Sequence, residues 1–272
     1  MKVTFSNLEQ FLTNATTASD LPVLLGVAED GVPVCLDLAK SPHLLIAGAP
    51  YKGKTSALRL LVGSLLKTKE PDDIKFLLMD SRFVSFSAFK NVALRTEVVP
   101  DCAAKLYELN SEMYRRFTIL QSSKCRNISE YNRTTLNRLP FIVCVIDDYS
   151  DLILGYNRQY ERIILETIIR IAQLGRAVGV HLVIATERPS LDVLPATIRV
   201  NFPSVMALKT ANPIDSVNLI GCPDANHLVG KGDLILKHED KLSQIQLAWL
   251  SEESAQKIAD DAYNRGFRPS DL

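Results

Sequence analysis

The feature that most constrains the fold is a glycine-rich segment between an apolar run and a helix-favouring run. Residues 43–55 read HLLIAGAPYKGKT, in which Gly48, Gly53, Lys54 and Thr55 form the pattern G-x-x-x-x-G-K-[ST]. The apolar residues before the pattern predict a strand, and the run SALRLLV after it predicts a helix. Glycines let the backbone wrap an anion, and amides at the start of a helix favour negative charge. The segment therefore predicts a phosphate-binding loop and a nucleotide site.

The loop and the first residues of its helix are expected to hold the nucleotide. Lys54 is predicted to reach the β- and γ-phosphates, and the Thr55 hydroxyl to ligate Mg²⁺. The predicted nucleotide-binding residues are Gly48, Ala49, Pro50, Tyr51, Lys52, Gly53, Lys54, Thr55 and Ser56.

A second, fully apolar strand over residues 141–146 ends in Asp147 and Asp148. Because parallel strands bring their carboxyl ends to one edge of a sheet, both carboxylates are expected beside the phosphate loop. We expect Asp147 to hold the Mg²⁺ through water, and Asp148 to orient or deprotonate the attacking water. A strand that ends in two aspartates could also simply begin a loop, but the phosphate loop upstream argues for the functional interpretation.

A third apolar strand over residues 181–186 leads into Thr186, Glu187 and Arg188. In a sheet that carries a phosphate loop, a neighbouring strand often delivers a residue that senses the γ-phosphate, and Thr186 or Glu187 is placed for that role. The structural alternative is that Thr186 caps a turn while Arg188 is solvated. The predicted catalytic residues are Lys54, Asp147, Asp148, Thr186 and Glu187.

Alternating strands and helices predict an α/β fold with a mostly parallel central sheet covered by helices on both faces. An amphipathic helical lead-in and a polar linker are expected over residues 1–20, and one domain over residues 21–272. A hairpin is expected from residues 21–27 and 32–38. Further strands are expected at 43–47, 74–80, 141–146, 181–186, 204–208, 234–236 and 244–248, and helices at 55–67, 102–122, 160–174 and 251–265.

Composition excludes several classes of protein. Lys+Arg and Asp+Glu number 31 each, so net charge gives no general case for binding nucleic acid or a membrane surface. The five cysteines are scattered and lack a C-x-x-C pair, which argues against a disulfide framework or a zinc site. Neither a secretory signal nor an apolar run of about 18 residues is found, which predicts a cytoplasmic chain.

Nine stretches between roughly residues 20 and 250 together carry a family resemblance. They are residues 31–48, 96–99, 112–117, 126–132, 146–152, 175–190, 201–203, 214–216 and 228–233. In their order and amino-acid sequence they resemble the motor domain of the FtsK/SpoIIIE family of double-stranded DNA translocases. The resemblance implies a RecA-like ATPase core that uses ATP and Mg²⁺. It also implies a hexameric ring that pulls duplex DNA without sequence preference, with pore loops near residues 191–199 or around 227–231.

The chain departs from the family pattern at several positions. Ala49, Pro50, Tyr51 and Lys52 fill the loop where small residues are usual, and Pro50 supplies no N–H to a phosphate. Asp148 is one methylene shorter than the family's glutamate. Three further substitutions are Glu187 for the usual glutamine, and Val205 and Val217 where the family has arginines. The remaining candidates for arginines that act on a neighbouring subunit are Arg176 and Arg188.

These departures keep a second interpretation open, in which the chain is a catalytically weak or regulatory ATP-binding module of a secretion or transfer machine. Its contact with a membrane or secretion partner would then run through another protein. A third interpretation, a small-molecule kinase, is disfavoured because no arginine-rich lid segment follows a central strand.

Overall fold

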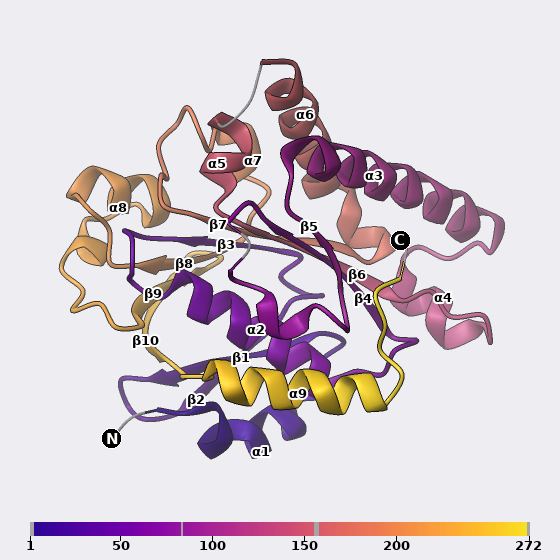
Figure 1. Ribbon diagram of the computed structural model, residues 1–272, viewed down its shortest axis with the longest axis horizontal. Helices are drawn as coiled ribbons and strands as arrows, with labels where there is room; N and C mark the ends of the chain where they lie inside the picture. The colour runs from indigo at the N-terminus through magenta and orange to yellow at the C-terminus, as the bar shows by residue number, and fades with distance from the viewer. Residues whose placement is uncertain (1–2, 83, 155–157, 271–272) are drawn as a thin grey trace.

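The computed structural model describes residues 3–82, 84–154 and 158–270, and its ten described strands form one sheet (Figure 1). The strand order is β2-β1-β10-β9-β8-β3-β7-β6-β4-β5. The strands are β1 Pro22–Ala28, β2 Pro33–Asp37, β3 His43–Ala47, β4 Ile74–Asp80, β5 Leu94–Thr96, β6 Phe141–Asp147, β7 Val180–Thr186, β8 Ser204–Leu208, β9 Asp233–His238 and β10 Lys241–Leu247.

The helices connect these strands and cover the sheet. They are α1 Phe5–Ala15, α2 Lys54–Thr68, α3 Val99–Ser122, α4 Ile128–Thr134, α5 Tyr149–Leu154, α6 Arg158–Leu174, α7 Ala196–Arg199, α8 Pro213–Ile220 and α9 Glu252–Asn264. None of the helices in the described ranges has both the length and the apolar character that a bilayer crossing requires.

The sheet has a parallel half and an antiparallel half. Strands β8, β3, β7, β6, β4 and β5 pair in parallel, whereas β9, β10, β1 and β2 add antiparallel neighbours beyond β8. In the parallel half, Ala47 pairs with Thr186 and Asp80 pairs with Asp147. The residues that end β3, β7, β6 and β4 therefore meet at one edge, as expected for an α/β sheet of this kind.

Both faces of the sheet are covered, which confirms the predicted layering. Helices α1, α2 and α9 pack on one face, and α3, α5, α6 and α8 on the other (Figure 1). Within β3, Leu44 and Ile46 belong to the first core and Leu45 and Ala47 to the second, because successive side chains of a strand point to opposite faces. This explains why the central strands are apolar throughout rather than alternating.

The predicted amino-terminal helix is present as α1. Leu8 and Leu12 are buried against β1 and α2, whereas Phe11 is 40% exposed. The backbone N–H of Phe5 donates to the Trp249 carbonyl at 3.0 Å, which joins the start of α1 to the chain beyond β10. Helix α1 therefore contributes to the core on the α2 face of the sheet.

Candidate active site

The glycine-rich loop, residues 48–53, joins β3 to α2 and is held from both sides. The Gly48 N–H donates to the Thr186 carbonyl at 3.4 Å, and the Ala49 N–H donates to the Lys209 carbonyl at 2.9 Å. A Cβ on Gly48 would lie 2.8 Å from the Cβ of Leu208, so only glycine fits there. The loop is therefore fastened to the ends of both strands that flank β3.

The middle of the loop has an unusual backbone. Tyr51 has a φ of 61° and its side chain is fully exposed. Gly53, which precedes the first residue of α2, has a φ of 120°. The first amides of α2 have no carbonyl partner within the helix, so they form an anion-binding terminus next to the loop.

Lys54 is 6% exposed and its ammonium group bends back over the loop. Its Nζ donates to the carbonyls of Gly48 and Ala49, each at 3.0 Å, and lies 3.1 Å from Oε1 of Glu187. Two residues predicted from separate motifs are thus in direct contact. A phosphate bound by the loop would compete with Glu187 for the same ammonium group.

Thr55 and Asp147 converge on the other side of the loop. The Thr55 hydroxyl lies 3.4 Å from Oδ2 of Asp147, and the Ser85 hydroxyl donates to the same oxygen. Burial raises the pKa of Asp147, and the hydrogen bond from Ser85 opposes that rise. No group of three or more His, Cys, Asp or Glu side chains suited to a metal occurs among the described residues. One hydroxyl and one carboxylate nevertheless fit Mg²⁺, which takes its remaining ligands from phosphate oxygens and water.

Asp148 is 5% exposed and has a φ of 54°, a conformation that aspartate tolerates better than most residues. The Ser150 hydroxyl donates to its Oδ1 at 2.6 Å. Arg82 forms an ion pair with the other oxygen, Oδ2. The carboxylate is therefore fixed in place beside Asp147.

Arg82 joins three carboxylates and was not among the predicted site residues. Besides Asp148, its guanidinium lies 3.2 Å from Asp151 and 3.9 Å from Glu187. These carboxylates raise the pKa of Arg82 despite the opposing effect of its partial burial. Arg82 belongs to the segment after β4, where no motif pointed to it.

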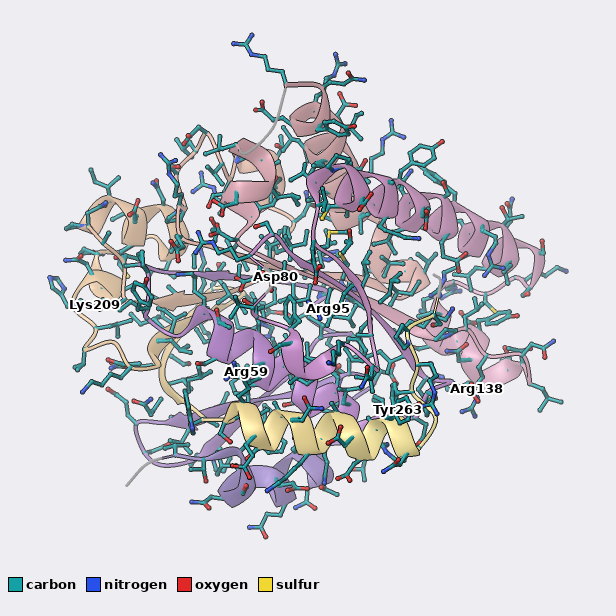
Figure 2. The ribbon with its side chains drawn as sticks, in the orientation of Figure 1. Arg59, Asp80, Arg95, Arg138, Lys209 and Tyr263 are labelled. Carbon is teal, nitrogen blue, oxygen red and sulfur yellow. The ribbon has the colours of Figure 1, made fainter. Side chains whose placement is uncertain are left out.

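Asp80 shapes the segment that carries Arg82 and Ser85. Its carboxylate accepts hydrogen bonds from the Arg82 N–H at 3.0 Å and the Ser85 N–H at 2.6 Å. Asp80 is 2% exposed and lies at the centre of the molecule in Figure 2. It thus positions two side chains of the site without being one of the phosphate-loop residues.

Thr186 and Arg188 lie at the carboxyl end of β7, whereas Arg176 lies before its amino end. Thr186 is fully buried and its hydroxyl accepts the Arg188 N–H at 3.1 Å, so it caps the turn after β7. Arg188 is exposed at the carboxyl edge of the sheet. Arg176 is exposed in the turn before β7, so the length of that strand separates it from the phosphate loop of its own chain. The action of either arginine on a neighbouring subunit stays a prediction.

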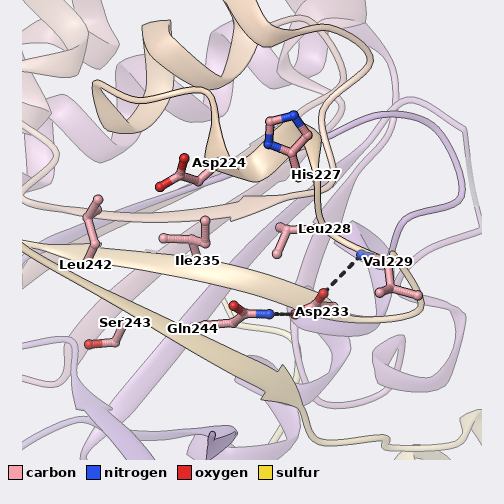
Figure 3. A pocket seen from close by; sticks show the side chains of 9 residues that line it. All are labelled: Asp224, His227, Leu228, Val229, Asp233, Ile235, Leu242, Ser243 and Gln244. Carbon is pink, nitrogen blue, oxygen red and sulfur yellow. Dashed lines mark hydrogen bonds between the residues drawn. The ribbon is translucent and has the colours of Figure 1, made fainter.

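The surface is hollowed beside the phosphate loop and again beside β9 and β10. One hollow, of about 510 Å³, is bounded by Tyr51, Gly53 and Ser56 on the loop side and by Gly232 and the end of β10 on the other. Another, of about 480 Å³, lies between the short 3-10 turn η3 (Asp224–Asn226) and strands β9 and β10 (Figure 3). In it Asp233 accepts hydrogen bonds from the Val229 N–H at 3.0 Å and from Gln244 at 2.9 Å.

The segment over residues 227–231 is also tied to the phosphate loop. Lys209, a residue just beyond β8 that is labelled in Figure 2, donates from its Nζ to the Leu228 carbonyl at 2.7 Å. A Cβ on Gly230 would lie 3.4 Å from Cδ of Lys52. This segment therefore lies next to the Lys52 side chain and is joined to the loop through Lys209, whose side chain holds Leu228 and whose carbonyl holds Ala49.

A protein-family model described as "FtsK/SpoIIIE family" matches residues 12–191. The chain belongs to the FtsK/SpoIIIE family. It is 35% identical to a DNA translocase FtsK of Treponema pallidum over 94% of this chain and 33% of that protein. It is 33% identical to a DNA translocase FtsK of Haemophilus influenzae over 90% of this chain and 52% of that protein. The chain thus spans between a third and about half of the length of these FtsK relatives.

Two solved structures share the fold of this chain. The pCW3 conjugation coupling protein TcpA, in its monomer form with ATPγS, superposes with a TM-score of 0.80 at 25% identity, over 89% of this chain and 71% of that one. The cytoplasmic domain of the Thermomonospora curvata type VII secretion ATPase EccC gives 0.82 at 26% identity, over 93% of this chain and 32% of that one. These neighbours confirm the predicted P-loop ATPase fold.

Proposed function

We propose that this chain hydrolyses ATP to move double-stranded DNA. The observation that carries the proposal is the meeting of Lys54, Thr55, Asp147 and Asp148 at one edge of the sheet in a chain of the FtsK/SpoIIIE family. The FtsK relatives are named as DNA translocases, which supports duplex DNA as the partner. The motor domain would comprise residues 21–272, preceded by the helical lead-in over residues 1–20.

Most of the predicted site residues have a direct role in this proposal. The loop amides and Lys54 bind the β- and γ-phosphates, and the 510 Å³ hollow beside Ser56 receives the base. Thr55 and Asp147 would hold Mg²⁺, which would neutralise part of the negative charge on the β- and γ-phosphates. Asp148 orients the attacking water and accepts its proton. Glu187, next to Lys54, senses the γ-phosphate.

The wider assembly is also part of the proposal. We infer a cytoplasmic, hexameric ring that binds DNA phosphates without sequence preference, which would make binding weaken with salt. The segment 227–231 is proposed to face DNA, because its hydrogen bonds to Lys209 and Asp233 link it to the phosphate loop and to β9. Arg176 or Arg188 would act on the nucleotide of the neighbouring subunit.

The proposal is tested by ATP turnover with and without linear duplex DNA. We expect DNA to raise kcat at least severalfold, and Lys54→Ala to abolish turnover in both conditions. Lys67→Ala is the matched control, because Lys67 is in the last turn of the same helix and pairs with Glu9 away from the loop. Tight ATP binding with negligible turnover in the presence of DNA would contradict the motor.

That contrary result would favour the second candidate, a regulatory ATP-binding module of a secretion or transfer machine. Two observations support this alternative. Lys54 is paired with Glu187 and Asp148 with Arg82, so both key groups are already engaged within the chain. In addition, TcpA is a conjugation coupling protein and EccC a secretion ATPase, and both share the fold.

A further inference from the structure

Five charged side chains form a connected set of ion pairs across the site. Lys54 contacts Glu187 at 3.1 Å, and the same oxygen of Glu187 lies 3.9 Å from Arg82. Arg82 in turn pairs with Asp148 and Asp151. Glu187 therefore lies between two cations, one presented by the phosphate loop and one by the segment after β4.

The two cations have different surroundings. Lys54 is 6% exposed and also donates to two loop carbonyls, whereas the Arg82 side chain is 54% exposed. The shorter contact of Glu187 is with Lys54, the group that binds the terminal phosphates in a phosphate loop. The Glu187 carboxylate thus contacts the ammonium group that a γ-phosphate, the group that distinguishes ATP from ADP, would bind.

We propose that Arg82 is a positioning residue that lets the site distinguish a nucleoside triphosphate from a diphosphate, through Glu187. A γ-phosphate at Lys54 repels the Glu187 carboxylate, because two anions then share one ammonium group. Arg82, already 3.9 Å away, supplies the cation to which Glu187 turns. A diphosphate presents only its β-phosphate to Lys54, so the side of the ammonium group that a γ-phosphate would take stays with Glu187.

This inference rests on the proposed nucleotide site but requires neither hydrolysis nor DNA. Without the Arg82 side chain, Glu187 would stay paired with Lys54 and oppose binding of the γ-phosphate. The neutral side chain of Glu187→Gln would remove the competition and with it the need for Arg82. Arg82 and Glu187 should therefore be energetically coupled in triphosphate binding alone.

The test compares Kd values for ATPγS and ADP by calorimetry at low ionic strength, where screening is weak. We expect Arg82→Ala to weaken ATPγS binding about twofold to fivefold, the effect of losing a partly exposed ion pair, while the Kd for ADP stays unchanged. Arg82→Lys should restore most of the loss because it keeps the charge. Arg59→Ala is the control, since Arg59 pairs with Glu252 on α9 instead.

A double-mutant cycle decides the mechanism. In a Glu187→Gln background, Arg82→Ala should have no further effect on the Kd for ATPγS. An undiminished effect there, or an equal loss of ADP binding in Arg82→Ala, overturns the role of Arg82. If the cycle shows the coupling but the wild-type chain does not turn over ATP with DNA, the proposed motor fails while the role of Arg82 stands.

Discussion

Oε1 of Glu112 lies 2.8 Å from Nε of Arg116, one turn further along α3. Arg116 is 1% exposed, and its Nη1 also donates to the carbonyls of Pro140 at 2.7 Å and Val178 at 3.0 Å. Pro140 directly precedes β6, and Val178 lies just before β7. One buried guanidinium thus ties α3 to the amino ends of the two strands that deliver Asp147 and Thr186 to the opposite edge.

This arrangement predicts that Arg116→Met strongly destabilises the fold. Loss of the cation leaves Glu112 and two carbonyls without their buried partner, and breaking such a pair typically costs about 3 kcal/mol or more. Arg115→Met is the matched control, because the Arg115 side chain is 57% exposed and should cost under about 1 kcal/mol. Urea unfolding measures both, and equal losses for the two variants would contradict the prediction.

Asp148→Asn should lower kcat for ATP by about a hundredfold or more, because the amide cannot accept a proton from the attacking water. ATP affinity should stay within about threefold, since Asp148 faces Arg82 and Ser150 rather than the loop amides. Asp151→Asn tests whether the effect is only the loss of a partner for Arg82, which both aspartates contact. A comparable fall in kcat in Asp151→Asn would remove the case for Asp148 as the base.

Asp147 should make Mg²⁺ binding depend on pH. Burial raises the pKa of this carboxylate, so a proton competes with the metal at a higher pH than for an exposed aspartate. Mg²⁺ affinity in the presence of ATPγS should therefore increase as the pH rises from about 5 to 7. Asp147→Asn should weaken Mg²⁺ binding at least about tenfold. The pH dependence of Mg²⁺ affinity that remains in this variant should come only from protonation of the nucleotide's phosphates. Identical pH profiles in the two proteins would contradict this.

His43 and His181 should make the fold sensitive to mild acid. Burial lowers the pKa of His43 to about 3 and that of His181 to about 4. In addition, His43 accepts the Leu182 N–H on Nδ1, a bond that protonation of that nitrogen would break. Between pH 6 and 5 the unfolded chain binds more protons at these two sites than the folded chain, so stability falls as the pH falls.

The size of the acid effect can be measured directly. Each histidine adds up to about 1.4 kcal/mol per pH unit to the slope of unfolding free energy against pH. His43→Asn retains an acceptor but takes up no proton, so its slope should be smaller by about that amount. His227→Asn is the control because His227 is exposed. An unchanged slope in His43→Asn would show that this imidazole does not take up a proton on unfolding.

Local patterns were sufficient to predict the parallel half of the sheet apart from its edge strand β5. The apolar runs that became β3, β4, β6 and β7 are buried on both faces, and the observed bounds differ from the expected ones by one residue at most. Helix α2 begins at Lys54 and ends at Thr68, each one residue outside the expected span. The short elements β5, α4, α5, α7 and α8 were not expected, because most of them depend on local capping or on packing against the longer elements.

Non-local relationships could not be read from the sequence. Strand β10 pairs with β1, so the amino-terminal hairpin extends the sheet beyond the carboxyl-terminal strands, and no local pattern encodes that pairing. The phosphate loop and the strand-end acids could be predicted because each has its own motif. Arg82 and Ser85 could not, since their segment has no motif and its place beside Asp147 and Asp148 depends on non-local contacts, such as the hydrogen bonds of Asp80.

The attachment of the phosphate loop to Lys209 has a mechanical consequence. The Lys209 carbonyl holds the Ala49 N–H while its ammonium group holds the Leu228 carbonyl, so the loop and the segment 227–231 are joined through one residue. A pull on that segment would displace the loop, and binding at the loop would displace the segment. Because such coupling is reciprocal, a ligand that binds the segment 227–231 should change the affinity for nucleotide by the same factor with which the nucleotide changes the affinity for that ligand.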